Sequence, residues 1–209
     1  MSELELVTRQ VGPWGMNTYA LICPTSRQSV LIDPGDDPEI LEAMLAGSQP
    51  VAILLTHTHI DHIGALPAMR QKLGVPVMGN DGPHEPGGKD IQADRWLRDG
   101  DTVAVGEHTL RAVYAPGHIG DQICFVIAAD HRIIVGDTIF DGGPGRTWSG
   151  EGFRTTLQTL RNVVLPWPDD TVCYPGHGPH FRLGDRREEI EAFLAKDHGD
   201  FFGDATWDM

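Results

Sequence analysis

The hydrophobic positions of the chain form short apolar runs and longer helical repeats that follow one another in a regular order. Apolar runs bounded by turn residues predict β-strands at 3–11, 17–23, 29–33, 51–55, 74–79, 102–105, 109–114, 123–128, 132–135 and 171–174. Apolar residues three and four apart predict helices at 38–47, 65–73, 153–164 and 183–198. On the first of these helices, the buried face is expected to hold Ile40, Leu41, Met44 and Leu45. The alternation of strands and helices between 29 and 79 indicates parallel pairing, whereas 3–11 reads as an edge strand.

A cluster of polar residues directly follows the strand predicted at 51–55. The sequence THTHIDH at 56–62 places three histidines and an aspartate within six positions, on a turn that enters a helix. His57 and His59 are two residues apart, so in extended backbone their side chains point the same way. Asp61 and His62 follow the bend and can face a second point nearby. Because imidazole and carboxylate are common metal ligands, the cluster indicates a metal site rather than a solvated polar turn.

Further candidate ligands also stand directly after predicted strands. His118 and His177 each occur in a Pro-Gly-His turn, and Asp137 follows an Ile-Ile-Val-Gly segment. Asp33 ends another apolar strand, where an unpaired carboxylate would be costly. It could either cap the turn or orient a metal-binding histidine.

Composition and charge narrow the function classes. The 209 residues are 40% hydrophobic and 22% charged, which predicts one globular domain over 1–209. A net charge of −14 argues against binding to nucleic acid or an anionic membrane. There is no apolar run of membrane-spanning length, and 1–10 lacks the apolar segment of a signal peptide. The three separated cysteines, Cys23, Cys124 and Cys173, are predicted to be buried reduced thiols, which favours a cytoplasmic location.

The His-x-His-x-Asp-His segment, with the later His118, Asp137 and His177, resembles the signature of the metallo-β-lactamase superfamily. The resemblance covers nearly the whole chain and is closest in character to short glyoxalase II-like (hydroxyacylglutathione hydrolase-like) enzymes. It implies an α/β fold, a four-layer αβ/βα sandwich of two mixed sheets with helices outside. The implied ligands are His57, His59 and His118 for a first metal, Asp61, His62 and His177 for a second, and Asp137 as the bridge. Asp33 would orient one of these histidines.

The activity implied by this resemblance is metal-dependent hydrolysis of a thioester or ester-like bond in a small acyl substrate. Two divalent metal ions would share a hydroxide nucleophile, which Asp61 would orient. Zinc is the expected metal, although iron or manganese could also bind because nitrogen and oxygen ligands discriminate poorly. Three alternatives stay open. They are a lactonase, a metal-binding module without catalysis, and a persulfide dioxygenase with one iron on His57, His118 and Asp137.

Substrate contacts are less firmly indicated. Full-length glyoxalase II enzymes carry a helical C-terminal region that binds glutathione, whereas only 32 residues follow His177 here. In place of the Gly-Arg-Thr-Asp-Phe of these enzymes, 145–149 reads GRTWS. The candidate substrate contacts are Trp14, Arg146, Trp148, Arg182 and Lys89, with Phe140 and Phe153 expected in the core. The loop at 80–99 is expected to flank the site, with His84 as an ordinary surface residue, and the tail at 199–209 to pack back on the surface or across a homodimer.

Overall fold

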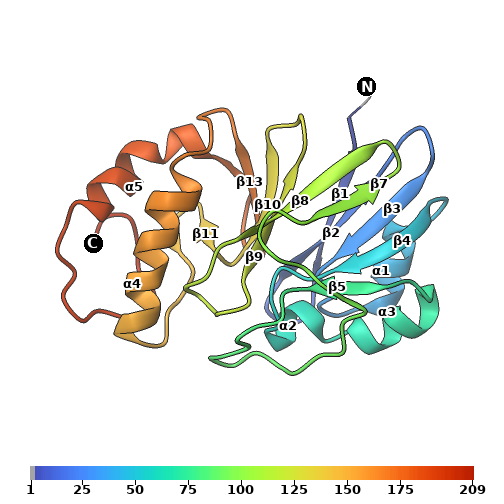
Figure 1. Ribbon diagram of the computed structural model, residues 1–209, viewed down its shortest axis with the longest axis horizontal. Helices are drawn as coiled ribbons and strands as arrows, with labels where there is room; N and C mark the ends of the chain where they lie inside the picture. Colours follow the sequence, from blue (N-terminus) through green and yellow to red (C-terminus); the bar gives the residue numbers. More distant parts are fainter. Residues whose placement is uncertain (1–2) are drawn as a thin grey trace.

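The computed structural model describes residues 3–209, and two six-stranded mixed sheets form its centre (Figure 1). The first sheet has the order β1 (Glu5–Val11), β2 (Met16–Ile22), β3 (Gln28–Ile32), β4 (Gln49–Leu54), β5 (Val77–Gly79) and β6 (Arg95–Trp96). The second has the order β14 (Phe181–Arg182), β13 (Val172–Pro175), β10 (Arg132–Gly136), β9 (Ile123–Ile127), β8 (His108–Tyr114) and β7 (Thr102–Val105). A separate pair is formed by β11 (Ile139–Phe140) and β12 (Gly143–Pro144).

Helices cover the outer faces of both sheets, which gives four layers (Figure 1). On the first sheet lie α1 (Pro38–Met44) and α3 (Leu66–Leu73), with the one-turn α2 (Ile60–Ile63) at its edge. On the second lie α4 (Gly150–Thr159), its π-helical continuation η1 (Leu160–Val164) and α5 (Arg187–Leu194), which the 3₁₀ turn η2 (Leu183–Asp185) precedes. The α/β sandwich predicted from the sequence is therefore confirmed.

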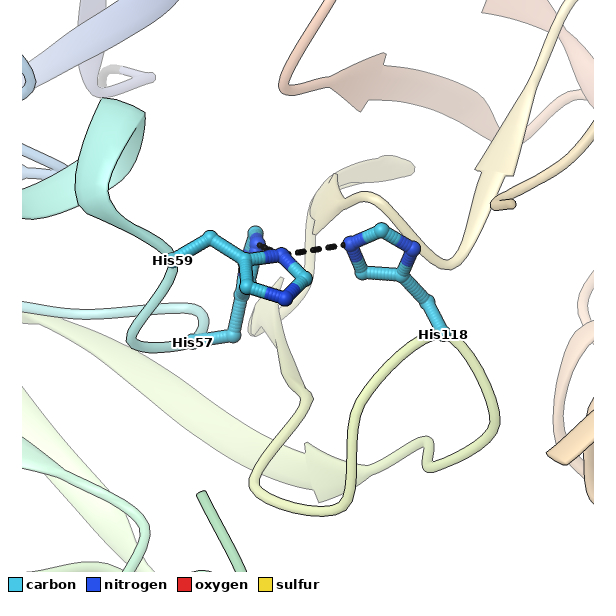
Figure 2. A group of neighbouring side chains, drawn as sticks. All are labelled: His57, His59 and His118. Atoms are coloured by element: carbon cyan, nitrogen blue, oxygen red, sulfur yellow. Dashed lines mark hydrogen bonds between the residues drawn. The ribbon is translucent and has the colours of Figure 1, made fainter. Parts of the chain in front are cut away.

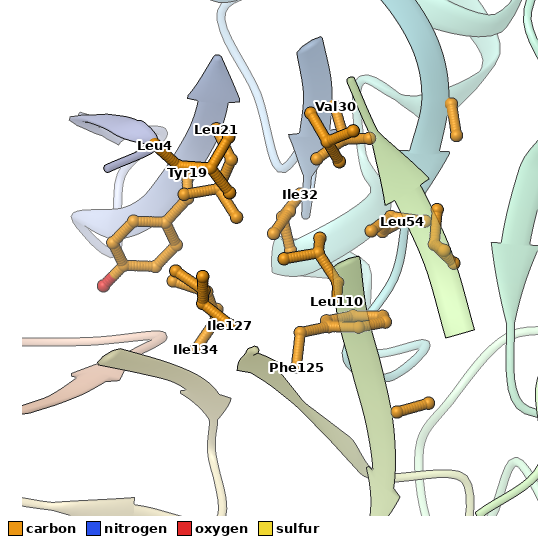
Figure 3. Close-up of a cluster of buried hydrophobic side chains, with 14 of the residues drawn as sticks. Leu4, Tyr19, Leu21, Val30, Ile32, Leu54, Leu110, Phe125, Ile127 and Ile134 are labelled. Carbon is orange, nitrogen blue, oxygen red and sulfur yellow. The ribbon is translucent and has the colours of Figure 1, made fainter. Parts of the chain in front are cut away.

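Alternation along the strands explains how each sheet buries both faces. In β3, Val30 and Ile32 face the core between the sheets, whereas Leu31 faces α1 and α3. In β9, Phe125 enters the same central core and Cys124 the core under α4 and α5. Figure 3 shows side chains of the two sheets meeting in the central core. Three apolar layers thus hold the four structural layers together.

The predicted strands agree with the observed ones to within a few residues, and the parallel pairing of β3, β4 and β5 is confirmed. The expected edge strand is β1, which pairs only with β2 among the described strands. Three helix predictions need correction. The one at 38–47 ends at Met44. The one at 153–164 begins earlier, because Ser149 Oγ accepts from the N–H of Gly152 at 3.1 Å and caps α4 at Gly150. That at 183–198 is interrupted after η2 and ends at Leu194.

The prediction for Ile40 was wrong. Leu41, Met44 and Leu45 are buried against the first sheet, but Ile40 is 40% exposed. In a helix of two turns the stripe through 41, 44 and 45 already spans the contact face, and residue 40 lies about 100° around the helix from residue 41.

The tail folds back on the molecule, as one of the two alternatives for it proposed. Trp207 is buried in the core under α5, with its ring 5.5 Å from that of Phe193 in an edge-to-face arrangement. Its indole N–H donates to the backbone oxygen of Asp141 at 2.9 Å. The cysteine prediction is also confirmed, because all three thiols are buried and free. Between residues 3 and 209, no helix combines the length and apolarity that crossing a membrane requires.

Candidate metal centre

The candidate ligands gather at one edge of the sandwich, on segments that follow strands of both sheets. His57 and His59 follow β4, and His118 follows β8. Asp137 comes directly after β10, and His177 follows β13. Backbone hydrogen bonds join the two sheets at this edge. Ile123 N–H donates to Thr56 O at 2.8 Å, and Asn17 N–H donates to Gly176 O at 2.7 Å. The strand ends therefore bring residues that are up to 120 positions apart into one site.

The second half of the motif lies on a one-turn helix that follows the two histidines of the first half. Asp61 and His62 belong to α2, where the N–H of His62 donates to the carbonyl of His59 at 3.0 Å. This single turn rotates Asp61 and His62 away from the first two histidines, so the motif faces two neighbouring points. Gly35 permits the close approach of α2, because a Cβ there would lie 2.1 Å from the backbone oxygen of Asp61.

A buried hydrogen-bond chain fixes two of the rings. The carboxylate of Asp33 accepts from the backbone N–H of Thr56 at 2.7 Å, from its hydroxyl at 2.6 Å and from His62 Nδ1 at 2.9 Å. Since the Thr56 hydroxyl proton goes to Asp33, its oxygen accepts from His57 Nδ1 at 3.1 Å. In both rings the Nε2 atom is therefore left to face the centre. The contact of Asp33 with His62 agrees with the orienting function expected for it.

Backbone carbonyls orient two further rings. His59 Nε2 donates to Pro86 O at 2.8 Å, and His118 Nδ1 donates to Arg146 O at 2.8 Å. The remaining nitrogens converge (Figure 2). His59 Nδ1 lies 3.1 Å from His57 Nε2 and 2.8 Å from His118 Nε2. In neutral rings held this way, all three carry lone pairs, and a cation between them would replace their repulsion with coordination.

Three overlapping groups of ligand atoms have all their members within 4.8 Å of one another. They are His57, His59 and His118; His57, His62 and Asp137; and Asp61, His62 and His177. The carboxylate of Asp137 stands between the first and third groups, 3.4 Å from His62 Nε2, 3.7 Å from His118 Nε2 and 3.8 Å from His177 Nε2. All seven predicted ligands are thus brought together.

Two buried atoms in this centre have no hydrogen-bond partner among the described residues. They are His62 Nε2 and Asp137 Oδ1, which lie 3.4 Å apart. Burying unpaired polar atoms costs free energy, and native structures rarely leave them so. Gly176 keeps the space open, because a Cβ there would lie 2.2 Å from Asp137 Oδ1. The donor set and these orphaned atoms fit bound divalent metal ions.

His57 and His118, on one side of the centre, have lowered pKa values that favour metal binding. Burial, reinforced by the neighbouring imidazoles, lowers the pKa of His57 well below its usual value. Burial also lowers the pKa of His118 to about 4. Both rings are therefore neutral near pH 7, the state in which imidazole binds a metal.

The other side of the centre holds excess negative charge. Burial raises the pKa of Asp137, but the adjacent His62 outweighs this and holds the carboxyl pKa well below its usual range. Burial lowers the pKa of His62, yet Asp137 and Asp33 overcome that effect and raise it well above its usual value. The carboxylates thus draw a proton onto His62 when nothing else supplies positive charge, and a dication would take that proton's place.

A cavity of about 880 Å³ opens onto the centre. Of the predicted substrate contacts, Trp14, Arg146 and Trp148 line it. Arg182 and Lys89 are not among its lining residues; Arg182 lies on β14 and donates to the backbone oxygen of Asp169 at 3.3 Å.

Sequence reasoning missed several residues of this region. Phe140 lines the cavity rather than the core, with its ring 6.3 Å from that of His177, whereas Phe153 is buried as predicted. The tail contributes Asp204, Ala205 and Thr206 to the cavity wall. No signal in the sequence predicted this, because the contact depends on how Trp207 anchors the tail.

The prediction that His84 is an ordinary surface residue was wrong. Its side chain is only 17% exposed, and its Nδ1 donates to Asp121 Oδ2 at 2.8 Å. Asp121 is fully enclosed and also accepts from the Thr58 hydroxyl at 2.7 Å. The available signal was Asp121 itself, an acidic residue in the turn after His118.

Comparisons with known proteins agree with this geometry. The family model of the metallo-beta-lactamase superfamily matches residues 12–178. The probable metallo-hydrolase YqgX of Bacillus subtilis is 31% identical over 187 residues, which cover 81% of this chain and 88% of that protein. A hydroxyacylglutathione hydrolase of Polaromonas sp. is 32% identical over 162 residues, which cover 76% of this chain. The matched part spans only 60% of that enzyme's length.

Solved structures show the same fold. ETHE1 from Myxococcus xanthus superposes with a TM-score of 0.79 at 25% identity, covering 92% of this chain and 86% of that one. TTHA1623, solved in a di-iron-bound form, superposes with a TM-score of 0.72 at 29% identity, covering 88% of this chain and 96% of that one. The family match over 12–178, together with these similarities, establishes that the chain belongs to the metallo-beta-lactamase superfamily and is a metallo-hydrolase.

Proposed function

We propose that this protein uses two divalent metal ions to hydrolyse a thioester or a similar ester-like bond in a small acyl substrate. The observation that carries the proposal is the position of Asp137. Its carboxylate lies within 3.8 Å of ring nitrogens from both candidate ligand groups, His118 on one side and His62 and His177 on the other. A single carboxylate so placed suits the bridge between two metal ions.

The ligand sets follow from the clusters described above. One ion would be held by His57, His59 and His118, and the other by Asp61, His62 and His177. When bound, such a pair of ions acidifies a water molecule and polarises the substrate carbonyl. Zinc is the proposed metal, with iron or manganese as the alternatives that the same nitrogen and oxygen ligands accept. The di-iron form of TTHA1623 supports iron as the main competitor.

Asp61 is suited to orient the attacking water. Its side chain lines the cavity, and its Oδ2 lies 3.0 Å from His177 Nε2. Burial raises the pKa of Asp61, but its hydrogen bond with His177 outweighs this and lowers the pKa below the usual value. Asp61 is therefore ionised near pH 7 and can accept a hydrogen bond from water.

The reaction itself needs only water and substrate. The water oxygen adds to the carbonyl carbon, the carbon–sulfur bond breaks, and the proton from water ends on the departing sulfur. The products are a carboxylic acid and a thiol. A thiolate leaves readily because thiols have a pKa near 8.5, so the site needs no strong general acid. The similarity to a hydroxyacylglutathione hydrolase supports the thioester class.

A second candidate is a dioxygenase that acts on a persulfide and holds one iron. The similarity to ETHE1 fits this alternative. The iron would take His57, His118 and Asp137, the combination of two histidines and one carboxylate that suits non-haem iron. The four remaining ligand candidates would then have no metal to bind, and for this reason we favour the two-metal hydrolase.

Metal analysis followed by activity assays separates these candidates. Protein purified without added metal would be analysed for zinc, iron and manganese, and then assayed on thioesters, lactones and a persulfide with an oxygen electrode. We expect close to two metal ions per chain and thioester cleavage without oxygen uptake. One iron per chain with oxygen consumption would favour the dioxygenase, and failure on every substrate would contradict both activities.

A further inference from the structure

Exposed apolar side chains in the cavity wall indicate what kind of substrate binds beside the candidate metal ligands. Three of the seven large apolar side chains that the described residues leave exposed line this one cavity. They are Trp14, Trp148 and Ile60, with exposures of 65%, 47% and 50%. Large exposed apolar groups are normally scattered singly, and their concentration marks a binding surface.

These three side chains come from separate parts of the chain. Trp14 belongs to the turn between β1 and β2, Ile60 begins α2, and Trp148 precedes α4. The Trp148 ring lies edge-on to His59, with 6.5 Å between ring centroids. Phe140 adds a fourth apolar ring beside His177. Apolar surface thus flanks the metal ligands on more than one side.

The charged side chains of the cavity argue against an anionic substrate. Among the described residues that line it, Arg146 is the one arginine or lysine. Its guanidinium is already engaged, because Nη1 donates to Asp204 Oδ2 at 2.7 Å and the group stacks over Trp148 at 4.8 Å from the ring centroid. A glutathione moiety carries two carboxylates. Among the described residues that line the cavity, no cationic side chain is free to bind them, because Asp204 neutralises Arg146.

We infer that the substrate is an uncharged thioester with an apolar acyl or thiol group, and that this group packs between Trp14, Ile60 and Trp148. The inference rests on the proposed function for the bond that is cleaved, but the packing itself can be tested without turnover. Under this assignment Arg146 and Asp204 close one wall of the cavity as a neutral pair, and Arg146 does not anchor an anion.

Binding of non-hydrolysable thioethers tests the inference directly. The two probes carry the same hexyl group, one on glutathione and the other on uncharged N-acetylcysteamine, and binding to the metal-loaded protein is followed by tryptophan fluorescence. We expect the uncharged probe to bind about tenfold tighter or more, because the carboxylates of the charged probe would lose hydration beside a wall that offers them no free cationic side chain. Equal binding, or tighter binding of the glutathione probe, would overturn the inference whether or not thioesters are cleaved.

Kinetics on matched thioesters give a second test. Lengthening the acyl chain on N-acetylcysteamine should raise kcat/KM by about two- to fourfold per methylene until the wall is covered. Trp148→Ala should raise KM for a hexanoyl thioester by about tenfold while changing kcat little, and should alter the acetyl thioester much less. An equal loss on both substrates would contradict packing of the acyl chain against Trp148.

A matched pair of isoleucines supplies the control. Ile60 and Ile40 are both half-exposed on helices, but only Ile60 lines the cavity. Ile60→Ala should weaken binding of the uncharged hexyl probe, whereas Ile40→Ala should leave it unchanged. Weaker binding in both variants would indicate a general effect on folding and count against the inference. Asp204→Asn completes the set, since it frees Arg146 to bind a carboxylate and should narrow the difference in affinity between the glutathione and uncharged probes. An unchanged difference would contradict the neutralisation of Arg146 by Asp204.

Discussion

His84 and Asp121 form an enclosed pair beside the candidate metal centre, with His84 Nδ1 2.8 Å from Asp121 Oδ2. The same carboxylate oxygen accepts from the hydroxyl of Thr58, which stands in sequence between two candidate ligands. The backbone oxygen of Thr58 in turn accepts from the N–H of Lys89 at 3.0 Å. The loop at 80–91 is thus fastened to the segment that carries the first two histidines, and one of its carbonyls, that of Pro86, orients His59.

Removing the hydrogen bonds that Asp121 accepts from His84 and Thr58 is expected to lower both the stability of the protein and its affinity for metal. Asp121→Ala leaves the enclosed groups of Thr58 and His84 without their acceptor, which should lower the free energy of unfolding by about 1–3 kcal/mol. Because His59 would lose its fixed carbonyl partner, metal affinity should fall as well. Urea unfolding of the metal-free protein and a competitive metal titration measure the two effects.

The chain contains a natural control for this prediction. His131 and Asp170 form a similar histidine–aspartate pair, 2.6 Å apart, but both side chains are more than half exposed. Asp170→Ala should therefore change the free energy of unfolding by less than about 0.5 kcal/mol and leave metal affinity unchanged. Equal effects of the two substitutions would show that burial of the His84 pair has no special importance.

The convergence of the candidate ligands could be predicted from the sequence, whereas their surroundings could not. Each candidate ligand lies in a segment that follows a strand, and the strand end is visible as an apolar run that stops at Thr, Gly or Pro. His118 and His177 were found because both stand in Pro-Gly-His turns of this kind. The part played by His84 depends on how a loop without periodicity folds over Asp121, and no local pattern encodes that contact. Similarly, Ile40 fits the spacing of an apolar helical stripe in the sequence. In the short helix α1, however, only the face that holds Leu41 and Met44 is covered by the first sheet.

Asp33 connects ligands of both proposed metal ions, directly to His62 and through Thr56 to His57. Its backbone φ of +54° is tolerated by Asn, so Asp33→Asn changes the chemistry with little strain. The amide cannot accept on both sides, and one of the donors now facing it loses its partner. We expect metal affinity to fall about 10–100-fold. Metal titration of this variant measures the effect, and Asp36→Asn, a substitution at an exposed neighbouring residue, is the control. An unchanged metal affinity in Asp33→Asn would show that the hydrogen bonds of Asp33 to Thr56 and His62 are unimportant for metal binding.

Trp207 links folding to substrate binding because it anchors the tail that supplies Asp204, Ala205 and Thr206 to the cavity. Trp207→Ala removes a buried indole and should lower the free energy of unfolding by about 3–5 kcal/mol. Under conditions where the variant remains folded, KM should rise more than kcat falls, since the candidate metal ligands lie outside the tail. Phe202→Ala truncates an aromatic residue of the same tail that is largely exposed, and should change neither quantity appreciably. Comparable losses in both variants would argue against a specific anchor.

The stability of the metal-free protein should depend on pH through His118. Burial lowers its pKa from 6.5 to about 4, so between these values the unfolded chain binds a proton that the folded chain does not. Stability from this group is therefore fully present above pH 6.5 and is lost as the pH falls toward 4. In His118→Gln that loss is absent. Between pH 6.5 and 4, the free energy of unfolding should therefore decrease less in the variant than in the parent protein, with a difference of up to about 3 kcal/mol. Urea unfolding of chelated protein at pH 7.0, 5.5 and 4.5 checks this, and parallel pH profiles for the two proteins would mean that His118 titrates normally in the fold.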